Sequence, residues 1–481
     1  MDIITDSAVL KERLAPLHNE KFVTIDTEFL REKTYYPLLC LVQVAGDNDA
    51  FAIDPLAADI DLTPLYDLLV DPKTLKVFHA CKQDMEILFY AMDKLPRSVF
   101  DTQVAAQVLG YGEAAGYGAL VEKICHIKLD KSSRHTDWSR RPLSRSQVDY
   151  AISDVTHLRL IYTYLKKELD LLDRNKWLDQ EMEPLIALDT YKQQPEDAWK
   201  MLKIRTTTPR FLAIVKEVAQ WREERARHVD KPRQWILKND GIMEIAAAVP
   251  KTPEDLGRLR YYNTKDEDIN RSLISAVEKG INNENPPKLE KKKPLPQGCG
   301  PLMDLLKVLL KMQCEHHNVA PSVVARTEDL EAIAMHHKDG MPDINCMRGW
   351  RLEVFGQYAM ALKHGKLGFT VQGRKIILIE PVDSQNPEAI KPAPNTVENT
   401  EPTPPVKKPE TKRKTSTNKE VTTDKELASK KKTTTPKSST AKATTSTKKA
   451  TIQEKATKPK AVKKTTEQTV SKEDAEIKLP S

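Results

Sequence analysis

Three short apolar runs follow one another near the N-terminus and then give way to a regular alternation. The runs have the length and residue types of buried strands and cover residues 22–25, 38–44 and 50–53. Beyond them, helices and strands are predicted to alternate at 62–69 (helix), 75–78 (strand), 83–92 (helix) and up to Phe100 (strand). Strands in succession followed by strand-helix alternation predict an α/β domain built on a mixed sheet.

Strand signals stop near residue 175, and the chain beyond it has a helical pattern to about residue 383. A stretch rich in lysine and proline interrupts this pattern and divides it into two helical modules. We therefore predict an α/β domain, a helical linker, a first helical domain, a second linker, a second helical domain and a tail at residues 1–175, 176–204, 205–284, 285–300, 301–383 and 384–481.

The positive charge of the chain lies in the tail. Residues 391–481 contain 22 Lys or Arg, 11 Asp or Glu and no aromatic residue. The whole chain has 76 Lys or Arg and 69 Asp or Glu, which leaves 54 against 58 for residues 1–390. A basic segment rich in Lys and Thr with few apolar residues predicts disorder. Two interpretations stay open: a solvated spacer, or a segment that binds a nucleic-acid backbone through counterion release.

Several classes of protein are disfavoured by simple sequence features. No apolar run approaches the roughly 18 residues that span a bilayer, and the acidic start of the chain lacks the basic region of a signal peptide. Six cysteines are scattered without a C-x-x-C pair, which disfavours a disulfide framework and a four-cysteine zinc site. We expect a cytoplasmic protein without a membrane partner.

Acidic residues stand on several separate predicted elements, and within an element their spacing places them on one face. Asp26 and Glu28 are two apart at the end of the first strand, so their side chains share a face. Asp84 lies at the start of a helix that follows another strand. Tyr150 and Asp154 are four apart on a predicted helix and also share a face. Because magnesium prefers oxygen ligands, this set predicts a metal-dependent hydrolase that acts on a polyanion.

A basic stretch precedes the helix of Tyr150. It is interleaved with aromatic residues and consists of Lys128, Lys131, Arg134, His135, Trp138, Arg140 and Arg141. Two interpretations stay open here as well. The stretch is either a solvated loop or a surface that contacts phosphates and stacks on bases, as single-stranded nucleic-acid sites do.

Six motifs together resemble the bacterial ribonuclease D family. They lie at residues 25–29, 34–37, 79–84, 100–103, 136–143 and 150–155. That family belongs to the tyrosine-type DEDD 3′-to-5′ exonucleases, whose catalytic domain has a ribonuclease H-like fold. The ordered pattern of D-x-E, Asp and Y-x-x-x-D is more specific than D-x-E alone. Residues 211–259 resemble the helical HRDC domain of the same family, and residues 323–351 resemble a second, divergent copy.

The resemblance implies roles for particular residues. It assigns catalysis to Asp26, Glu28, Asp84, Tyr150 and Asp154. The four carboxylates are implied to hold two divalent ions, Mg²⁺ or Mn²⁺, while Tyr150 positions the attacking water. Contacts with the substrate are expected from Thr27, Phe29, His79, Arg140 and Arg141. Asp101 also matches the family, but a structural role is expected for it.

The implied activity is removal of nucleoside 5′-monophosphates from RNA 3′ ends, in the 3′ maturation of transfer-RNA precursors, by a protein assumed to be a monomer. The HRDC domains are implied to hold structured RNA. Two alternatives remain open from the residues alone. The first is a DNA 3′-to-5′ exonuclease, and the second is a catalytically inactive scaffold that binds RNA.

Overall fold

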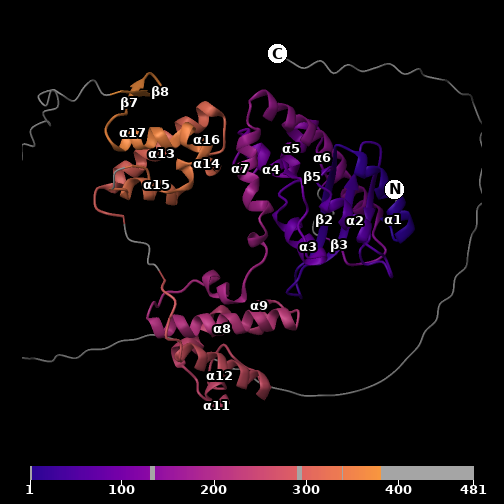
Figure 1. Ribbon diagram of the computed structural model, residues 1–481, viewed down its shortest axis with the longest axis vertical. Coiled ribbons are helices and arrows are strands. Elements are labelled where there is room, and N and C mark those ends of the chain that lie inside the picture. The colour runs from indigo at the N-terminus through magenta and orange to yellow at the C-terminus, as the bar shows by residue number, and fades with distance from the viewer. Residues whose placement is uncertain (1–2, 131–135, 290–294, 338–339, 381–481) are drawn as a thin grey trace, which may run out of the picture. The chain divides into compact units, whose positions relative to one another are not determined.

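The computed structural model describes residues 3–130, 136–289, 295–337 and 340–380. Near the N-terminus, six strands form one mixed sheet in the order β1-β4-β3-β2-β5-β6. Figure 1 shows β2, β3 and β5 of this sheet among the helices of the domain. The strands are β1 (Ile3–Ile4), β2 (Phe22–Leu30), β3 (Leu38–Ala45), β4 (Ala50–Ile53), β5 (Leu75–Phe78) and β6 (Val99–Asp101). β2 pairs antiparallel with β3 and parallel with β5, so the central strand joins the two halves of the sheet. The predicted mixed-sheet α/β class is confirmed.

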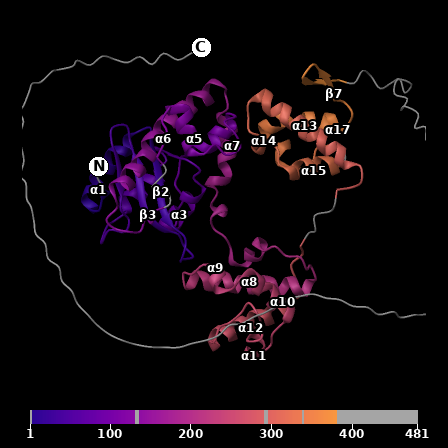
Figure 2. The same cartoon turned by 180° about the vertical axis from the view of Figure 1, so that it is seen from behind.

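Helices cover both faces of this sheet. They are α1 (Ser7–Leu14), α2 (Thr63–Val70), α3 (Lys82–Met92), α4 (Thr102–Val108), α5 (Tyr117–Leu120), α6 (Arg145–Leu171) and α7 (Asn175–Ile186). α1, α2 and α3 share an apolar core with Val23 and Ile25 of β2. α6 lies on the opposite face, against β2, β3 and β4 (Figure 2). Because side chains alternate along a strand, Asp26 and Glu28 belong to the α6 face and Thr27 to the α3 face.

Side-chain caps determine where the helices beside the sheet begin. Ser144 accepts the backbone N–H of Gln147, whose side chain accepts the backbone N–H of Ser144 in return, so α6 starts with a capping box. Asp101 ends β6 and caps α4 by accepting the backbone N–H of Gln103 at 2.7 Å. These caps satisfy N–H groups that a helix start leaves without partners.

A first helical region follows the α/β domain. Its helices are α8 (Pro209–His228), α9 (Arg233–Ile236), α10 (Asn239–Ala248), α11 (Pro253–Leu256) and α12 (Glu267–Ile281). They enclose an apolar core that includes Val218, Ile242 and Leu273. α12 carries its buried residues on one face, as expected of a helix packed on a single side. The predicted limits of this domain, 205–284, stay predictions.

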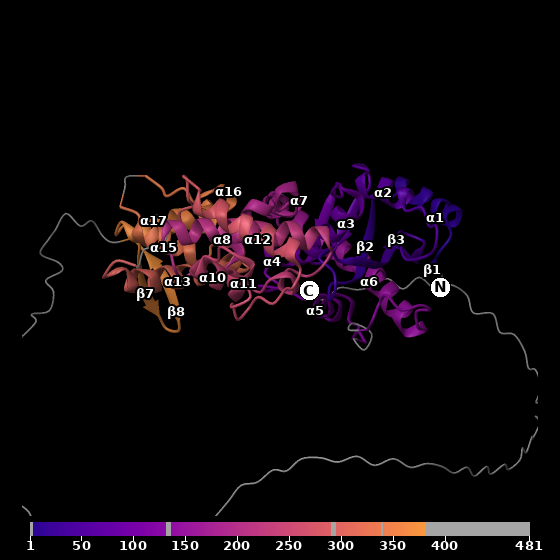
Figure 3. The same cartoon turned by 90° about the horizontal axis from the view of Figure 1, so that it is seen from below.

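A second helical region has its own core around Leu306, Ile333 and Phe355. Its main helices are α13 (Cys299–His317), α14 (Pro321–Val324), α15 (Thr327–Met335), α16 (Gly349–Arg351) and α17 (Gln357–Lys363). The expectation that strand signals stop beyond residue 175 is wrong here. β7 (Gly368–Gln372) and β8 (Lys375–Ile379) form an antiparallel hairpin (Figure 3). This hairpin packs on the core through Phe369 and Leu378. Gly373 has a φ of 62°, the left-handed conformation that such a tight turn needs.

Two further details of the α/β domain differ from the sequence-based expectation. β2 continues to Leu30, so Asp26 and Glu28 lie within the strand and not at its end. β1 is only two residues long and was not predicted, because so short a strand has no period to detect. All six cysteines are free thiols, as their scatter predicted. Within the described ranges, no helix is long and apolar enough to cross a membrane. The predicted tail lies outside the described residues.

Candidate active site

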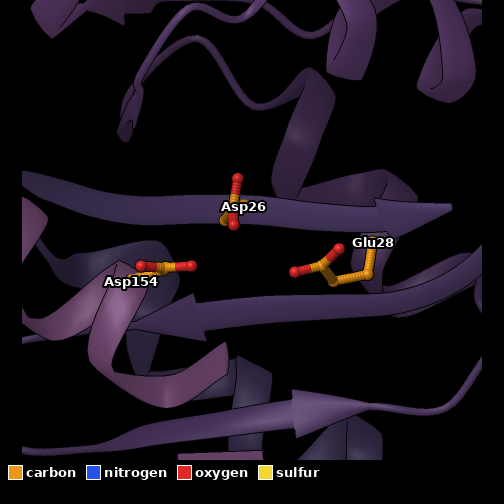
Figure 4. Close-up of side chains that lie close together, drawn as sticks. All are labelled: Asp26, Glu28 and Asp154. Carbon is orange, nitrogen blue, oxygen red and sulfur yellow. The ribbon is translucent and has the colours of Figure 1, made fainter. Parts of the chain in front are cut away.

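A cleft of about 810 Å³ opens where β2, α3, α5 and α6 meet. Asp26 and Glu28 line it from β2, and Asp154 lines it from α6. One carboxylate oxygen from each of these three residues lies within 4.8 Å of the other two. Figure 4 shows the carboxylates of Glu28 and Asp154 on either side of Asp26 and directed toward each other. Three oxygen donors at these separations suit a divalent cation.

Two hydrogen bonds hold the turn of α6 that carries Asp154. The hydroxyl of Thr24, which is fully buried on β2, donates to the carbonyl oxygen of Val155 at 2.8 Å. The hydroxyl of Tyr117, at the start of α5, donates to the carbonyl oxygen of Asp154 at 2.5 Å. The backbone of α6 is therefore fixed to β2 on one side and to α5 on the other, so the backbone that carries the carboxylate of Asp154 has a defined position.

Asp84 approaches from the other face of the sheet. It lies in the first turn of α3, is 7% exposed and lines the cleft. The hydroxyl of Thr27 donates a hydrogen bond to its Oδ1. Asp101 holds the turn before α3, because its carboxylate accepts the backbone N–H groups of Ala80 at 3.0 Å and Cys81 at 2.7 Å. This is the structural role that the sequence indicated for Asp101.

The electrostatics of the cleft favour a bound cation. Burial raises the pKa of Asp26 from 3.8 to about 6. Burial also raises the pKa of Asp84 well above its ordinary value, and the negative charge of Asp26 raises it further. A divalent cation among these groups would stabilise their ionised forms and remove the repulsion between them. The donor set therefore fits the divalent metal that enzymes with this exonuclease fold use.

Tyr150 lies one turn before Asp154 on α6 and lines the cleft. Burial raises the pKa of its phenol, and the charges of Asp154 and Glu28 add to this shift. The hydroxyl therefore keeps its proton at neutral pH and can donate a hydrogen bond. Trp138, which is 2% exposed, packs beside it with the ring centres 6.2 Å apart. This packing restricts the orientation of the Tyr150 ring.

His79 is the last residue before the turn that leads to α3, and it also lines the cleft. Its Nδ1 lies 2.9 Å from the hydroxyl oxygen of Thr102. Its ring packs against the ring of Tyr117, with the centres 5.5 Å apart. Burial lowers the pKa of the imidazole, while the charge of Asp101 opposes this shift, so the ring is neutral at neutral pH.

Arg140 and Arg141 were expected to contact the substrate, but in the structure neither belongs to the residues that line the cleft. Arg141 forms two hydrogen bonds to the carboxylate of Asp54, at 2.5 and 2.6 Å, and donates to the carbonyl oxygen of Cys40. Arg140 is 83% exposed and pairs with Asp137. Neither side chain lines the cleft. A phosphate contact through Arg141 is therefore not supported, because its guanidinium is already bound to a carboxylate that is 6% exposed.

The other expected site residues share one cleft. They are Asp26, Thr27, Glu28, Phe29, His79, Asp84, Tyr150 and Asp154. Lys131, Arg134 and His135 of the basic stretch lie outside the described residues. The sequence reasoning missed Tyr117 and Gln103, which line the same cleft. Tyr117 stands between two glycines, a pattern that is typical of a loop and gives no sign of a hydrogen bond to α6.

Comparisons with known proteins agree with this geometry. Residues 1–170 match the 3′-5′ exonuclease family, and residues 211–265 match the HRDC domain family. The chain is 44% identical to ribonuclease D of Nitrobacter hamburgensis over 384 residues, which cover 79% of this chain and all of that protein. It is 42% identical to ribonuclease D of Bartonella henselae over 382 residues, which cover 78% of this chain and 93% of that protein.

A solved structure extends the comparison to the fold. The crystal structure of Escherichia coli RNase D, described as an exoribonuclease involved in structured RNA processing, matches with a TM-score of 0.65 and 26% identity. The match covers 76% of this chain and 98% of that chain. The similarity therefore spans both the sheet domain and the helical regions that follow it.

Proposed function

The chain belongs to the ribonuclease D family and is a 3′-to-5′ exoribonuclease, and from this premise we propose that it trims transfer-RNA precursors that carry 3′ extensions. The related Escherichia coli enzyme is described as acting in structured RNA processing, and such precursors are structured RNAs with a single-stranded 3′ end. The observation that carries the proposal is the group of Asp26, Glu28 and Asp154 within 4.8 Å of one another in an open cleft. We further propose that the protein acts as a monomer.

We propose that two divalent cations, Mg²⁺ or Mn²⁺, bind to the four carboxylates. Asp26, Glu28 and Asp154 supply one group of oxygen donors, and Asp84, which lines the same cleft, supplies a further carboxylate. The raised pKa values of Asp26 and Asp84 support this proposal, because a cation would compensate the clustered charge. When bound, the cations lower the pKa of a water molecule and stabilise negative charge on the leaving oxygen.

We propose that Tyr150 orients the attacking water. Its phenol keeps its proton and lies one helical turn from Asp154, where it can orient a water molecule toward the scissile phosphorus. Attack forms a bond between the water oxygen and phosphorus and breaks the bond from phosphorus to the 3′-oxygen. The products are a nucleoside 5′-monophosphate and an RNA that is one nucleotide shorter, with a free 3′-hydroxyl. The attacking water gives up one proton to the solvent, and the leaving 3′-oxygen takes one proton from the solvent.

Substrate contacts are proposed for the residues of the cleft that are not carboxylates. Phe29 and His79 both line the cleft, where they offer an apolar ring and a polar ring. Thr27 acts through Asp84, since its hydroxyl is already bound to that carboxylate. Arg140 stays a candidate for a phosphate contact because its side chain is exposed. Arg141 is assigned a structural role instead.

The alternatives that the sequence left open make different predictions. A DNA exonuclease would use the same carboxylates, so only the substrate distinguishes it from the proposed enzyme. A scaffold without catalysis has no need of a cleft in which all four carboxylates and Tyr150 gather. A cytoplasmic location and the second HRDC-like domain stay predictions.

The test uses a 5′-labelled transfer-RNA precursor with a short 3′ extension, incubated with the full chain in Mg²⁺, in Mn²⁺ and without metal. The matching DNA strand and an unstructured RNA of equal length serve as controls. The proposal expects metal-dependent shortening that stops near the mature 3′ end of the precursor. Shortening of the DNA strand alone would favour the first alternative, and binding without shortening in either metal would favour the scaffold.

A further inference from the structure

The hydrogen bonds of His79 determine which of its ring nitrogens carries the proton. The hydroxyl of Thr102 donates to the carbonyl oxygen of Phe78 at 3.0 Å, so its proton is already used. The same hydroxyl oxygen lies 2.9 Å from Nδ1 of His79. Nδ1 must therefore be the donor in that bond. In the neutral ring, the proton lies on Nδ1 and the other nitrogen, Nε2, is an acceptor.

Nε2 is the nitrogen that remains available to a ligand. Nδ1 is bound to Thr102, which is fully buried, and His79 lines the cleft beside Gln83 and Asp84. No partner for Nε2 occurs among the described residues. The ring of Tyr117 packs against the imidazole and limits its rotation. The cleft that holds the carboxylates therefore also contains an oriented acceptor without a proton.

The chemistry of RNA limits what such an acceptor can bind. Phosphate oxygens carry no proton at neutral pH, so they cannot donate to Nε2. Base amino and imino groups can donate, but their positions differ from base to base. The 2′-hydroxyl is a donor that every nucleotide of an RNA presents in the same place, and the 3′-hydroxyl is a donor that every new 3′ end presents. An enzyme that shortens an RNA stepwise meets each base in turn, so a hydroxyl is the donor that fits.

We propose that Nε2 of His79 accepts a hydrogen bond from a ribose hydroxyl of the RNA held in the cleft, which makes His79 a specificity-determining residue. This inference rests on the proposed exoribonuclease activity. The hydroxyl comes from either the 2′ or the 3′ position of a nucleotide near the 3′ end. A 2′-hydroxyl would give the enzyme a preference for RNA over DNA, because DNA lacks that group.

The test compares first-cleavage rates on four 5′-labelled oligoribonucleotides of one sequence. One is all-ribose, one has 2′-deoxyribose at the last nucleotide, one has 2′-deoxyribose at the nucleotide before it, and one ends in 3′-deoxyribose. The full chain is tested as wild type and as His79→Phe, which keeps an aromatic ring but has no acceptor. His126→Phe is the matched control, since His126 is exposed and does not line the cleft.

A second variant and a second readout separate recognition from folding. Thr102→Val removes the acceptor for Nδ1 and frees the imidazole to turn, without changing any group that faces the RNA. Binding of the same oligonucleotides, measured by fluorescence anisotropy with each variant in an Asp154→Asn background, reports affinity without cleavage. The melting temperature of each variant shows whether it is folded.

We expect wild type and His126→Phe to cleave the all-ribose substrate about three- to tenfold faster than one of the deoxy substrates. A rate difference of this size corresponds to the loss of one hydrogen bond. His79→Phe should lose this preference, with a lower rate on the all-ribose substrate and an unchanged rate on that deoxy substrate. Thr102→Val should reduce the preference in part. Equal losses on all four substrates, or a preserved preference, would overturn the inference. In both cases RNA is still shortened, whereas no shortening by wild type would refute the proposed function itself.

Discussion

The side-chain hydroxyl of Thr27 on β2 donates a hydrogen bond to Oδ1 of Asp84 on α3. Thr27 lies between Asp26 and Glu28 in the sequence, but its side chain leaves the strand on the opposite face. One strand therefore supplies two carboxylates to the cleft and also supports a third that belongs to another element. The position of Asp84 depends on the strand as much as on its own helix.

Replacing Thr27 by Val removes this hydrogen bond and keeps the shape of the side chain. A hydrogen bond to a charged group contributes about 1.5–3 kcal/mol, so we expect kcat to fall by at least about tenfold. The Mg²⁺ concentration for half-maximal activity should rise, with little change in KM for RNA. Thr156→Val is the matched control, because its hydroxyl bonds only to carbonyl groups within α6. Equal metal dependence of the two variants would contradict the role of Thr27.

The turn that leads to α3 offers a second test. Asp101→Asn keeps the size of the side chain but replaces one of the oxygens that accept backbone N–H groups from Ala80, Cys81 and Gln103. We expect a loss of about 1–2 kcal/mol of unfolding free energy in urea, as for other caps, together with a lower kcat. Asp6→Ala, which removes the cap of α1 away from the cleft, should lower stability without affecting kcat. If both variants lower stability and neither affects kcat, the turn does not position Asp84.

Arg141 distinguishes the structural account from the sequence-based one. Its guanidinium is bound to Asp54, which is 6% exposed, so Arg141→Ala leaves a carboxylate without its partner in a buried position. We expect a loss of about 2–4 kcal/mol of unfolding free energy, with KM for RNA unchanged under conditions where the variant is folded. Arg145→Ala, which breaks an exposed pair with Asp149, should change stability by less than about 0.5 kcal/mol. A raised KM with unchanged stability would restore Arg141 as a phosphate contact.

The ionisation of the cleft carboxylates should determine how metal binding changes with pH. The pKa of Asp26 is about 6 in the folded, metal-free protein and 3.8 in its ordinary environment. Between pH 3.8 and about 6, the folded protein therefore keeps a proton on Asp26 that the unfolded chain has lost. Stability of the metal-free protein should therefore fall as pH rises from about 4 to about 6. A cation needs the ionised carboxylate, so Mg²⁺ should raise the melting temperature more at pH 7.5 than at pH 5. Equal shifts at both values, measured by thermal unfolding, would contradict this account.

The residues proposed for catalysis were accessible to sequence reasoning because their spacing carries the geometry. Asp26 and Glu28 share a strand face at a period of two, and Tyr150 and Asp154 share a helix face four residues apart. The same two periodicities predict which segments of the α/β domain are strands and which are helices. The order of the motifs indicated the family. The resemblance to that family implied that residues on separate elements gather in one cleft.

The supporting contacts were not accessible, because they join residues far apart in the chain. Thr24 and Val155 are 131 residues apart, and Arg141 and Asp54 are 87 apart, so no local pattern reveals either bond. The bond of Arg141 to Asp54 could not be foreseen for this reason, since a basic stretch looks the same whether a guanidinium is free or bound to a buried carboxylate. The hairpin of β7 and β8 was missed because two five-residue strands after long helices give a weak periodic signal.

The central claim, a metal-dependent exoribonuclease that works from the 3′ end through the carboxylate group, is tested most directly by labelling one RNA at its two ends in separate samples. In Mg²⁺, the 3′-labelled sample should release labelled mononucleotide at once, while the 5′-labelled sample shortens stepwise. Asp154→Asn should abolish both signals and still bind the RNA. Release of mononucleotide from the 5′ end first, internal fragments, or full activity in Asp154→Asn would contradict the account.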